Sequence, residues 1–160
     1  MATITPFLWF EKNAEEAMSF YTSVFKNSKV VSVRRYPKGS PGDMDGQVMT
    51  ADFELEGQRL IILNGGPEFR QSEAFSLFVQ VEDQAEVDYY WEKLTADGGE
   101  ESVCGWLKDK YGLSWQIVPK ALNELIGDPD PEKSKRAMAA MLKMRKIIVA
   151  DLEAAVNSVE

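Results

Sequence analysis

Residues 48–63 read VMTADFELEGQRLIIL, and this stretch decides the fold. In its first half, apolar side chains alternate with Thr50, Asp52 and Glu54, the pattern of a strand with one face buried. Glu56-Gly57 turns the chain, and residues 58–63 supply a second strand. The stretch therefore predicts a β-hairpin with one apolar and one polar face.

The flanking sequence completes a βαβββ unit over residues 1–66. Residues 4–10 are short and aromatic, which favours a strand, and residues 29–36 predict another. Between them Asn13 predicts a helix cap, followed by acidic residues in the first turn. The helix then carries apolar residues at helical spacing: Ala17, Phe20, Tyr21 and Val24.

Residues 74–119 repeat this order of elements. We expect a strand over 74–81, a helix capped by Asp83, and strands over 102–109 and 113–118. The helical apolar residues of the two halves match with one constant offset, and the hairpin glycines Gly57 and Gly112 match as well. The prediction is an α+β fold of paired βαβββ units, forming one domain over 1–119, with an unrelated α+β domain as the alternative.

Residues 120–160 predict a C-terminal helical extension. Asp130 and Pro131 are typical of a helix start. A methionine-rich stripe follows, at Ala137, Met138, Met141 and Leu142. This stripe either packs on the domain, which we favour, or binds a partner.

Charge and composition restrict the possible functions. The net charge of −8 disfavours nucleic acid and anionic membranes, which need a basic surface. The chain has no histidine, which excludes mechanisms that need an imidazole base or ligand. A single cysteine, Cys104, and the absence of a signal peptide or a long apolar run predict a cytoplasmic protein.

Three stretches carry a family resemblance: residues 8–21 (LWFEKNAEEAMSFY), 83–94 (DQAEVDYYWEKL) and 104–119 (CGWLKDKYGLSWQIVP). They resemble the PhnB-like branch of the vicinal oxygen chelate superfamily, which includes glyoxalases, extradiol dioxygenases and bleomycin resistance proteins. The resemblance implies paired βαβββ units and a homodimer. The branch often carries the label 3-demethylubiquinone-9 3-methyltransferase, although Asn64-Gly-Gly-Pro-Glu68 does not fit a Rossmann-type glycine loop.

The resemblance also locates the positions that hold metal in the metal-using relatives. Counting from the helix caps and hairpin glycines places them at Pro6, Ser76, Gln116 and Ile61. Two of these side chains have no donor atom, and a neutral hydroxyl and amide bind divalent ions weakly. We therefore expect no metal at this site and no cofactor.

A cleft between the two units is the expected ligand site. Alternation predicts that its wall includes nine residues from five strands: Pro6, Leu8, Phe10, Thr50, Asp52, Ser76, Phe78, Trp106 and Gln116. Asp52 or Glu54 is a possible general base if buried. Cys104 is interpreted as structural, because no neighbouring cation or base would hold its thiolate. The catalytic residues, if any, are not identified.

Three functions compete. The preferred one is a metal-free protein that binds a small, partly apolar molecule in the cleft. The second is a superfamily enzyme that acts through cleft carboxylates or an unrecognised metal site. The third is an interaction protein whose methionine-rich tail binds a partner.

Overall fold

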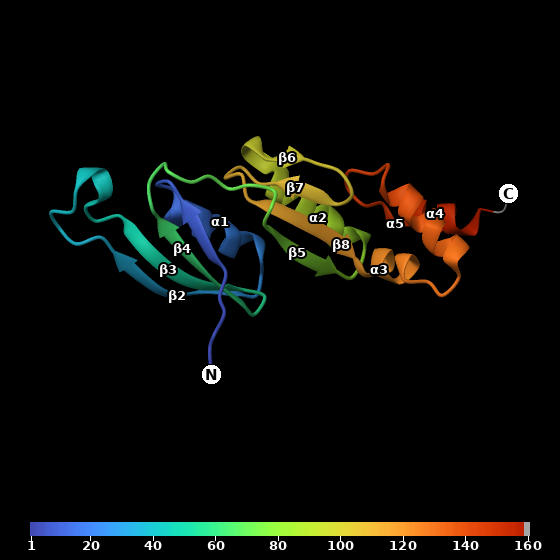
Figure 1. Ribbon diagram of the computed structural model, residues 1–160, viewed down its shortest axis with the longest axis horizontal. Coiled ribbons are helices and arrows are strands. Elements are labelled where there is room, and N and C mark those ends of the chain that lie inside the picture. The colour runs from blue at the N-terminus through green and yellow to red at the C-terminus, as the bar shows by residue number, and fades with distance from the viewer. Residues whose placement is uncertain (159–160) are drawn as a thin grey trace. The chain divides into compact units, whose positions relative to one another are not determined.

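The computed structural model describes residues 1–158 and forms two compact units that divide between Gln71 and Ser72. Each unit contains one four-stranded mixed sheet and one helix packed against it (Figure 1). The second unit also carries the C-terminal helices. The predicted α+β class, the paired βαβββ units and the helical extension are confirmed.

In the first unit the chain order β-α-β-β-β gives the sheet order β1-β4-β3-β2. β1 is parallel to β4, and the other neighbours are antiparallel. The predicted hairpin is β3 and β4, joined by Glu56 and Gly57 with positive φ. The elements are β1 (Phe7–Phe10), α1 (Ala14–Val24), β2 (Ser28–Arg35), the short 3-10 helix η1 (Gly42–Met44), β3 (Val48–Leu55) and β4 (Gln58–Asn64).

The second unit repeats this topology with the order β5-β8-β7-β6. β5 is parallel to β8, and β7 is antiparallel to both β8 and β6. The strand predicted over 102–109 is shorter than expected, because a turn at Cys104-Gly105 separates β6 from β7. The elements are β5 (Ser76–Val81), α2 (Gln84–Thr95), the 3-10 helix η2 (Ala96–Gly98), β6 (Glu100–Glu101), β7 (Trp106–Lys108) and β8 (Ser114–Pro119).

The two main helices begin in different ways. The Asp83 side chain accepts a hydrogen bond from the Glu86 amide, so the predicted cap of α2 is confirmed. Asn13 occupies the N-cap position of α1 as predicted, but its side chain makes no capping hydrogen bond. Instead the buried Asn64 of β4 accepts from the Ala14 amide at 2.9 Å and donates to the Val48 carbonyl. A residue distant in sequence thus ties the helix start to the sheet.

One face of each sheet is buried beneath its helix. In the first unit the helix contributes Tyr21, and the sheet contributes Phe53, Leu60 and Ile62. In the second, α2 packs on β7 and β8 through Trp91, with Trp115 and Ile117 fully buried. Burying a large apolar side chain stabilises the fold by roughly 1.5–3 kcal/mol. The other face of each sheet, which we call the open face, is not covered by that helix.

The C-terminal extension forms three helices: α3 (Lys120–Ile126), which the sequence pattern did not reveal, α4 (Pro131–Met141) and α5 (Val149–Asn157). The Asp130 cap and the start of α4 at Pro131 are confirmed. Leu122, Ile147 and Leu152 pack around Val118 at the end of β8. The Gln84 amide holds the segment before α5, because it donates to the Ile147 carbonyl and accepts from the Val149 amide.

Among residues 1–158, no helix is both long and apolar enough to cross a bilayer.

Candidate functional site

A row of three side chains crosses the open face of the second sheet. Gln116 in β8 pairs in register with Phe78 of β5 on one side and with Trp106 of β7 on the other. Phe78 is 53% exposed, and Trp106 and Gln116 are partly exposed. We call this set the Phe78–Gln116–Trp106 row. It presents two aromatic side chains with one amide between them.

Ser76 completes this group. The Gln116 Nε2 atom donates to Ser76 Oγ at 3.0 Å, which fixes the orientation of the amide. The four residues predicted for the second unit, Ser76, Phe78, Trp106 and Gln116, therefore lie together on one face. Their alternation with Trp115 and Ile117, which are buried on the helix side, accounts for this placement.

The C-terminal extension limits this face at one end. Alternation along β8 places Val118 on the same side as Ser114 and Gln116. Val118 is nevertheless buried, because Leu122, Ile147 and Leu152 cover it. Gln116 is therefore the one residue of β8 that is not buried.

The orientation predicted for Leu8 and Phe10 is wrong. Leu8 pairs in register with Ile62 and Phe10 with Asn64, and both side chains lie in the core under α1, 3% and 4% exposed. Pro6 lies just before β1, where its carbonyl accepts from the Ile61 amide. Leu8 and Phe10 therefore cannot belong to a ligand-binding face.

The error arises from the connection between the first strand and its helix. Three residues, 11–13, separate β1 from α1, but only two, 82–83, separate β5 from α2. Phe7 pairs with Ile61, as Phe78 pairs with Gln116, so Phe7 is the counterpart of Phe78. Counting back from the helix cap shifts the first strand by one residue and so exchanges its two faces.

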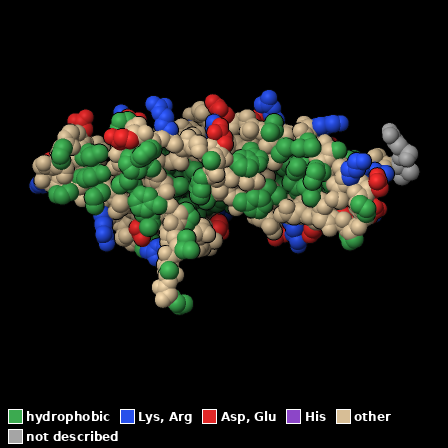
Figure 2. All heavy atoms as spheres, viewed as in Figure 1, with side chains coloured by type: hydrophobic (Ala, Val, Ile, Leu, Met, Phe, Trp, Pro, Cys, Tyr) green, Lys and Arg blue, Asp and Glu red, His purple; other side chains and the backbone are tan. Residues whose placement is uncertain are grey.

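The open face of the first sheet carries Ile61, which the sequence analysis placed there, and three apolar residues that it missed: Phe7, Trp9 and Leu63. Apolar side chains gather over this unit in Figure 2. The Trp9 ring packs edge-on against Phe69 at 5.0 Å, and its Nε1 atom donates to the Gly66 carbonyl. Gly65 is required here, since a Cβ atom would lie 2.5 Å from the Trp9 ring. Knowledge of the parallel register between β1 and β4 would have placed Phe7, Trp9 and Leu63 on this open face.

Thr50 and Asp52 lie on this open face as predicted, because they pair with Leu63 and Ile61. The carboxylates are engaged in ion pairs. Asp52 lies 3.4 Å from the Arg59 guanidinium, and Glu54 lies 3.5 Å from the Lys29 ammonium. Both side chains are partly exposed, so neither has the buried environment that the general-base hypothesis requires.

The positions that would correspond to metal ligands do not suit a divalent ion. In the second unit they supply a hydroxyl and an amide, Ser76 and Gln116, which bind each other. In the first unit Ile61 has no donor, and the register makes Thr5, not Pro6, the counterpart of Ser76. Within residues 1–158, no three His, Cys, Asp or Glu side chains are grouped so that they could hold a metal.

Two hollows lie in the second unit. The first, about 180 Å³, borders the Phe78–Gln116–Trp106 row and is lined by Glu73, Glu100, Glu101, Ser102, Trp106, Leu107, Lys108 and Ser114. Lys108 forms an ion pair with Glu73 there. The hydrogen bond and charge of this pair raise the pKa of Lys108 and lower the pKa of Glu73.

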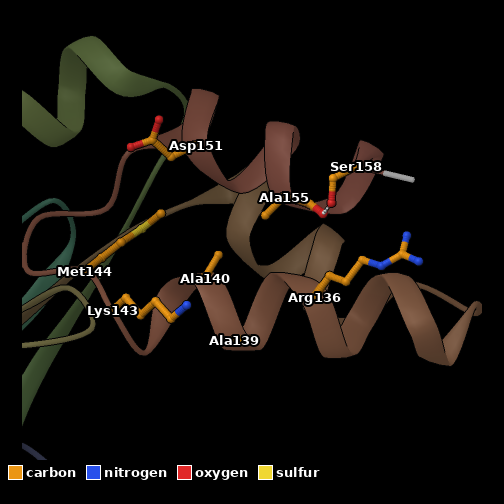
Figure 3. Close-up of a pocket in the computed structure, with 8 residues that line it drawn as sticks. All are labelled: Arg136, Ala139, Ala140, Lys143, Met144, Asp151, Ala155 and Ser158. Carbon is orange, nitrogen blue, oxygen red and sulfur yellow. Dashed lines mark hydrogen bonds between the residues drawn. The ribbon is translucent and has the colours of Figure 1, made fainter. Parts of the chain in front are cut away.

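The second hollow, about 440 Å³, opens between α4 and α5 (Figure 3). Alanine side chains line it, Arg136 projects from α4, and Lys143 projects from the turn that follows α4. The Arg136 guanidinium donates to the Val156 carbonyl at 3.4 Å, which connects the two helices. Asp151 and Ser158 of the α5 side also line this hollow.

The topology and the open sheet faces define the class of protein. Paired βαβββ units with equivalent sheet orders, here β1-β4-β3-β2 and β5-β8-β7-β6, and one open face each are the architecture of the vicinal oxygen chelate superfamily. The chain belongs to the PhnB-like family described as 3-demethylubiquinone-9 3-methyltransferase, whose profile matches residues 2–118.

Solved structures agree with this assignment. A PhnB protein from Bacillus cereus, a candidate 3-demethylubiquinone-9 3-methyltransferase, is 40% identical; the match covers 74% of this chain and 99% of that one, with a TM-score of 0.68. A protein from Pseudomonas aeruginosa is 20% identical over 74% of this chain and 98% of that one, with a TM-score of 0.63. At that identity the second likeness shows the fold alone.

The fold also extends to a fosfomycin resistance protein. FosX from Listeria monocytogenes, in complex with Mn(II) and sulfate, is 15% identical over 78% of this chain and 94% of that one, with a TM-score of 0.52. No curated protein matches the chain.

Proposed function

We propose that the protein binds a small, partly apolar molecule on the open face of its second sheet, without a metal ion. The observation that carries the proposal is the Phe78–Gln116–Trp106 row. Phe78 is more than half exposed in the middle of a strand. An exposed aromatic residue beside a fixed amide is typical of a ligand surface.

The row supplies both parts of a selective contact. The rings of Phe78 and Trp106 offer apolar area, which contributes affinity in proportion to the surface removed from water. Gln116, oriented by Ser76, offers a directional polar group. A planar molecule with one polar substituent would match this arrangement.

The proposal does not transfer the chemistry of the relatives. Mn(II) binding belongs to FosX, whose 15% identity supports a common fold and no more. The methyltransferase description belongs to the family, and the structure offers no glycine-rich loop between a strand and a helix at residues 64–68. The enzyme alternative that uses Asp52 or Glu54 gains no support, because both are ion-paired.

The test is an NMR titration of the ¹⁵N-labelled protein with 1-naphthol, a neutral planar probe. We expect amide shifts to concentrate at Ser76, Phe78, Trp106 and Gln116. Phe78→Ser should weaken binding about tenfold, because it removes one ring from the contact. The matched control is Leu142→Ser, which removes an exposed apolar side chain from the same unit.

Two results would overturn the proposal. One is a pattern of shifts spread evenly over the surface. The other is equal affinity of the Phe78→Ser and Leu142→Ser proteins for 1-naphthol. Elemental analysis with stoichiometric metal in the purified protein would contradict the metal-free part.

We further propose that the protein is a cytoplasmic homodimer, as the family resemblance implies. Light scattering after size-exclusion chromatography should give twice the 18.0 kDa mass of one chain. A mass of one chain at micromolar concentration would contradict this expectation.

A further inference from the structure

The hollow beside Trp106 contains an unusual polar group. Ser114, in β8, is 1% exposed, and its Oγ atom has no hydrogen-bond partner among the described residues. A buried hydroxyl without a partner costs roughly 1–3 kcal/mol. Such a group needs an explanation, and the side chain lines a hollow of about 180 Å³.

The strand geometry directs Ser114 into this hollow. Trp115 lies on the helix side, so the preceding Ser114 points to the open face. Its register partners are Ser76 on β5 and Lys108 on β7. Glu73, just before β5, reaches Lys108 on β7, so the Glu73–Lys108 ion pair spans β8 at the level of Ser114.

The charge of the lining favours a cation. Two carboxylates, those of Glu73 and Glu100, are set against one ammonium group, that of Lys108. Glu101 pairs in register with the buried Leu107, so its carboxylate lies on the helix side. Lys108 binds Glu73, and Glu101 accepts a hydrogen bond from Trp91 Nε1 at 2.7 Å. Glu100 pairs in register with Lys108 and adds to the negative potential that raises the pKa of Lys108. The lining is thus negative even with Lys108 protonated.

We propose that this hollow binds the ammonium group of a small arylalkyl amine. Ser114 Oγ and the Glu100 carboxylate accept its hydrogens, and the Trp106 ring provides a cation–π contact. The aromatic body of the amine lies along the Phe78–Gln116–Trp106 row. This inference rests on the proposed function and names its ligand class.

Lys108 occupies the place of the ligand's charge in the free protein. Its ammonium satisfies Glu73, and both side chains are partly exposed, so the pair is able to open. An incoming amine competes with Lys108 for the carboxylates. Replacing Lys108 by methionine, which keeps the apolar stem, should therefore strengthen amine binding.

The experiment compares three probes of similar shape by NMR titration of the full chain: benzylammonium, benzyl alcohol and benzoate. We expect benzylammonium to bind about tenfold more tightly than the other two, with a preference that decreases as salt is added. Lys108→Met should strengthen benzylammonium binding severalfold. Tighter binding of benzoate than of benzylammonium would instead show an anion site and overturn the inference. Loss of benzoate binding in Lys108→Met would point to the same anion site.

Two further variants test the named contacts, and a third serves as their control. Ser114→Ala and Glu100→Gln should each weaken benzylammonium binding about threefold to tenfold. The matched control is Glu92→Gln, an exposed glutamate on α2. Ser114→Ala removes only an unpaired hydroxyl, so the melting temperature should not fall. Unchanged affinity in both Ser114→Ala and Glu100→Gln would mean that the hollow holds water only, and would overturn the inference.

Binding of 1-naphthol separates the two proposals. If 1-naphthol shifts the row but benzylammonium shows no preference over benzyl alcohol, the ammonium site fails and the proposed function stands. If neither probe shifts residues of the row or the hollow, both fail. Because Glu100→Gln leaves the row intact, it should bind 1-naphthol like the unmodified protein.

Discussion

Asp109 accepts a hydrogen bond from the indole of Trp115, with Oδ2 and Nε1 2.8 Å apart and both residues buried. The other oxygen, Oδ1, accepts from the backbone amides of Tyr111 and Leu113. One carboxylate thus shapes the turn between β7 and β8 and holds Trp115 on the helix side. This contact fixes which face of β8 presents Ser114 and Gln116.

Asp109→Asn should destabilise the protein by roughly 2–3 kcal/mol. The three hydrogen bonds described above come from N–H donors, and an asparagine NH₂ group must face at least one of them. Urea unfolding followed by tryptophan fluorescence measures the change. Asp43→Asn is the matched control, because Asp43 is exposed in η1. Equal unfolding midpoints for the two variants would refute this role of Asp109.

Phe10→Ala should cost roughly 3–5 kcal/mol, and Phe7→Ala less than about 1 kcal/mol. Phe10 is buried beneath α1, whereas Phe7 is 54% exposed on the open face. Each variant removes the same ring from the same strand, so each serves as the other's control. Thermal or urea unfolding gives the comparison, and a larger loss for Phe7→Ala would contradict the β1 register.

Gln84→Ala should loosen the C-terminal extension. The side chain makes bonds of 3.0 Å to the Ile147 carbonyl and 2.8 Å to the Val149 amide. Losing both should lower the local opening free energy by roughly 1–3 kcal/mol. Hydrogen exchange at the Val149 and Leu152 amides reports it. Gln80→Ala, an exposed glutamine of the same unit, should leave these amides protected.

Asp88 should titrate below its ordinary value of 3.8. Hydrogen bonds from Lys146, 2.7 Å away, and from Gln84 lower the pKa of Asp88. Because the folded pKa is depressed, the stabilisation is present above pH 3.8 and is lost as pH falls through the folded value. Carbon-detected NMR of the Asp88 carboxyl should show the low midpoint, and Lys146→Met should raise it.

Lys143→Met is the matched control for that titration. Lys143 is an exposed lysine of the extension, and in the described residues 1–158 the ion pair of Asp88 is with Lys146, so the loss of Lys143 should not move the midpoint. A midpoint that is the same in Lys146→Met as in the unmodified protein would show that the ion pair does not form in solution.

The sequence predicted the second unit better than the first. Alternation along residues 113–118 and the capping by Asp83 gave the correct face for Ser76, Phe78 and Gln116. Alternation also placed Thr50 and Asp52 correctly. These are local patterns, in which each side chain's direction follows from its neighbours.

The errors involve contacts between distant residues. The face of β1 depends on its register with β4, whose paired residues are 54 positions away, and a one-residue difference before the helix reverses that face. The helix start at Ala14 depends on Asn64, not on the adjacent Asn13. The burial of Val118 depends on Ile147 and Leu152. None of these contacts leaves a periodic signal near the residue that it affects.

The cover over Val118 has a consequence for how long a molecule this surface can accommodate. The match with the B. cereus relative covers 99% of that chain but 74% of this one. About a quarter of this chain therefore lies outside the match. The C-terminal extension covers one end of the open face of the second sheet, at Val118. For the proposed ligand, this cover would block the sheet beyond Gln116 at Val118 and leave the direction towards Ser114 open. We therefore expect this chain to prefer shorter ligands than a protein whose sheet lacks such a cover.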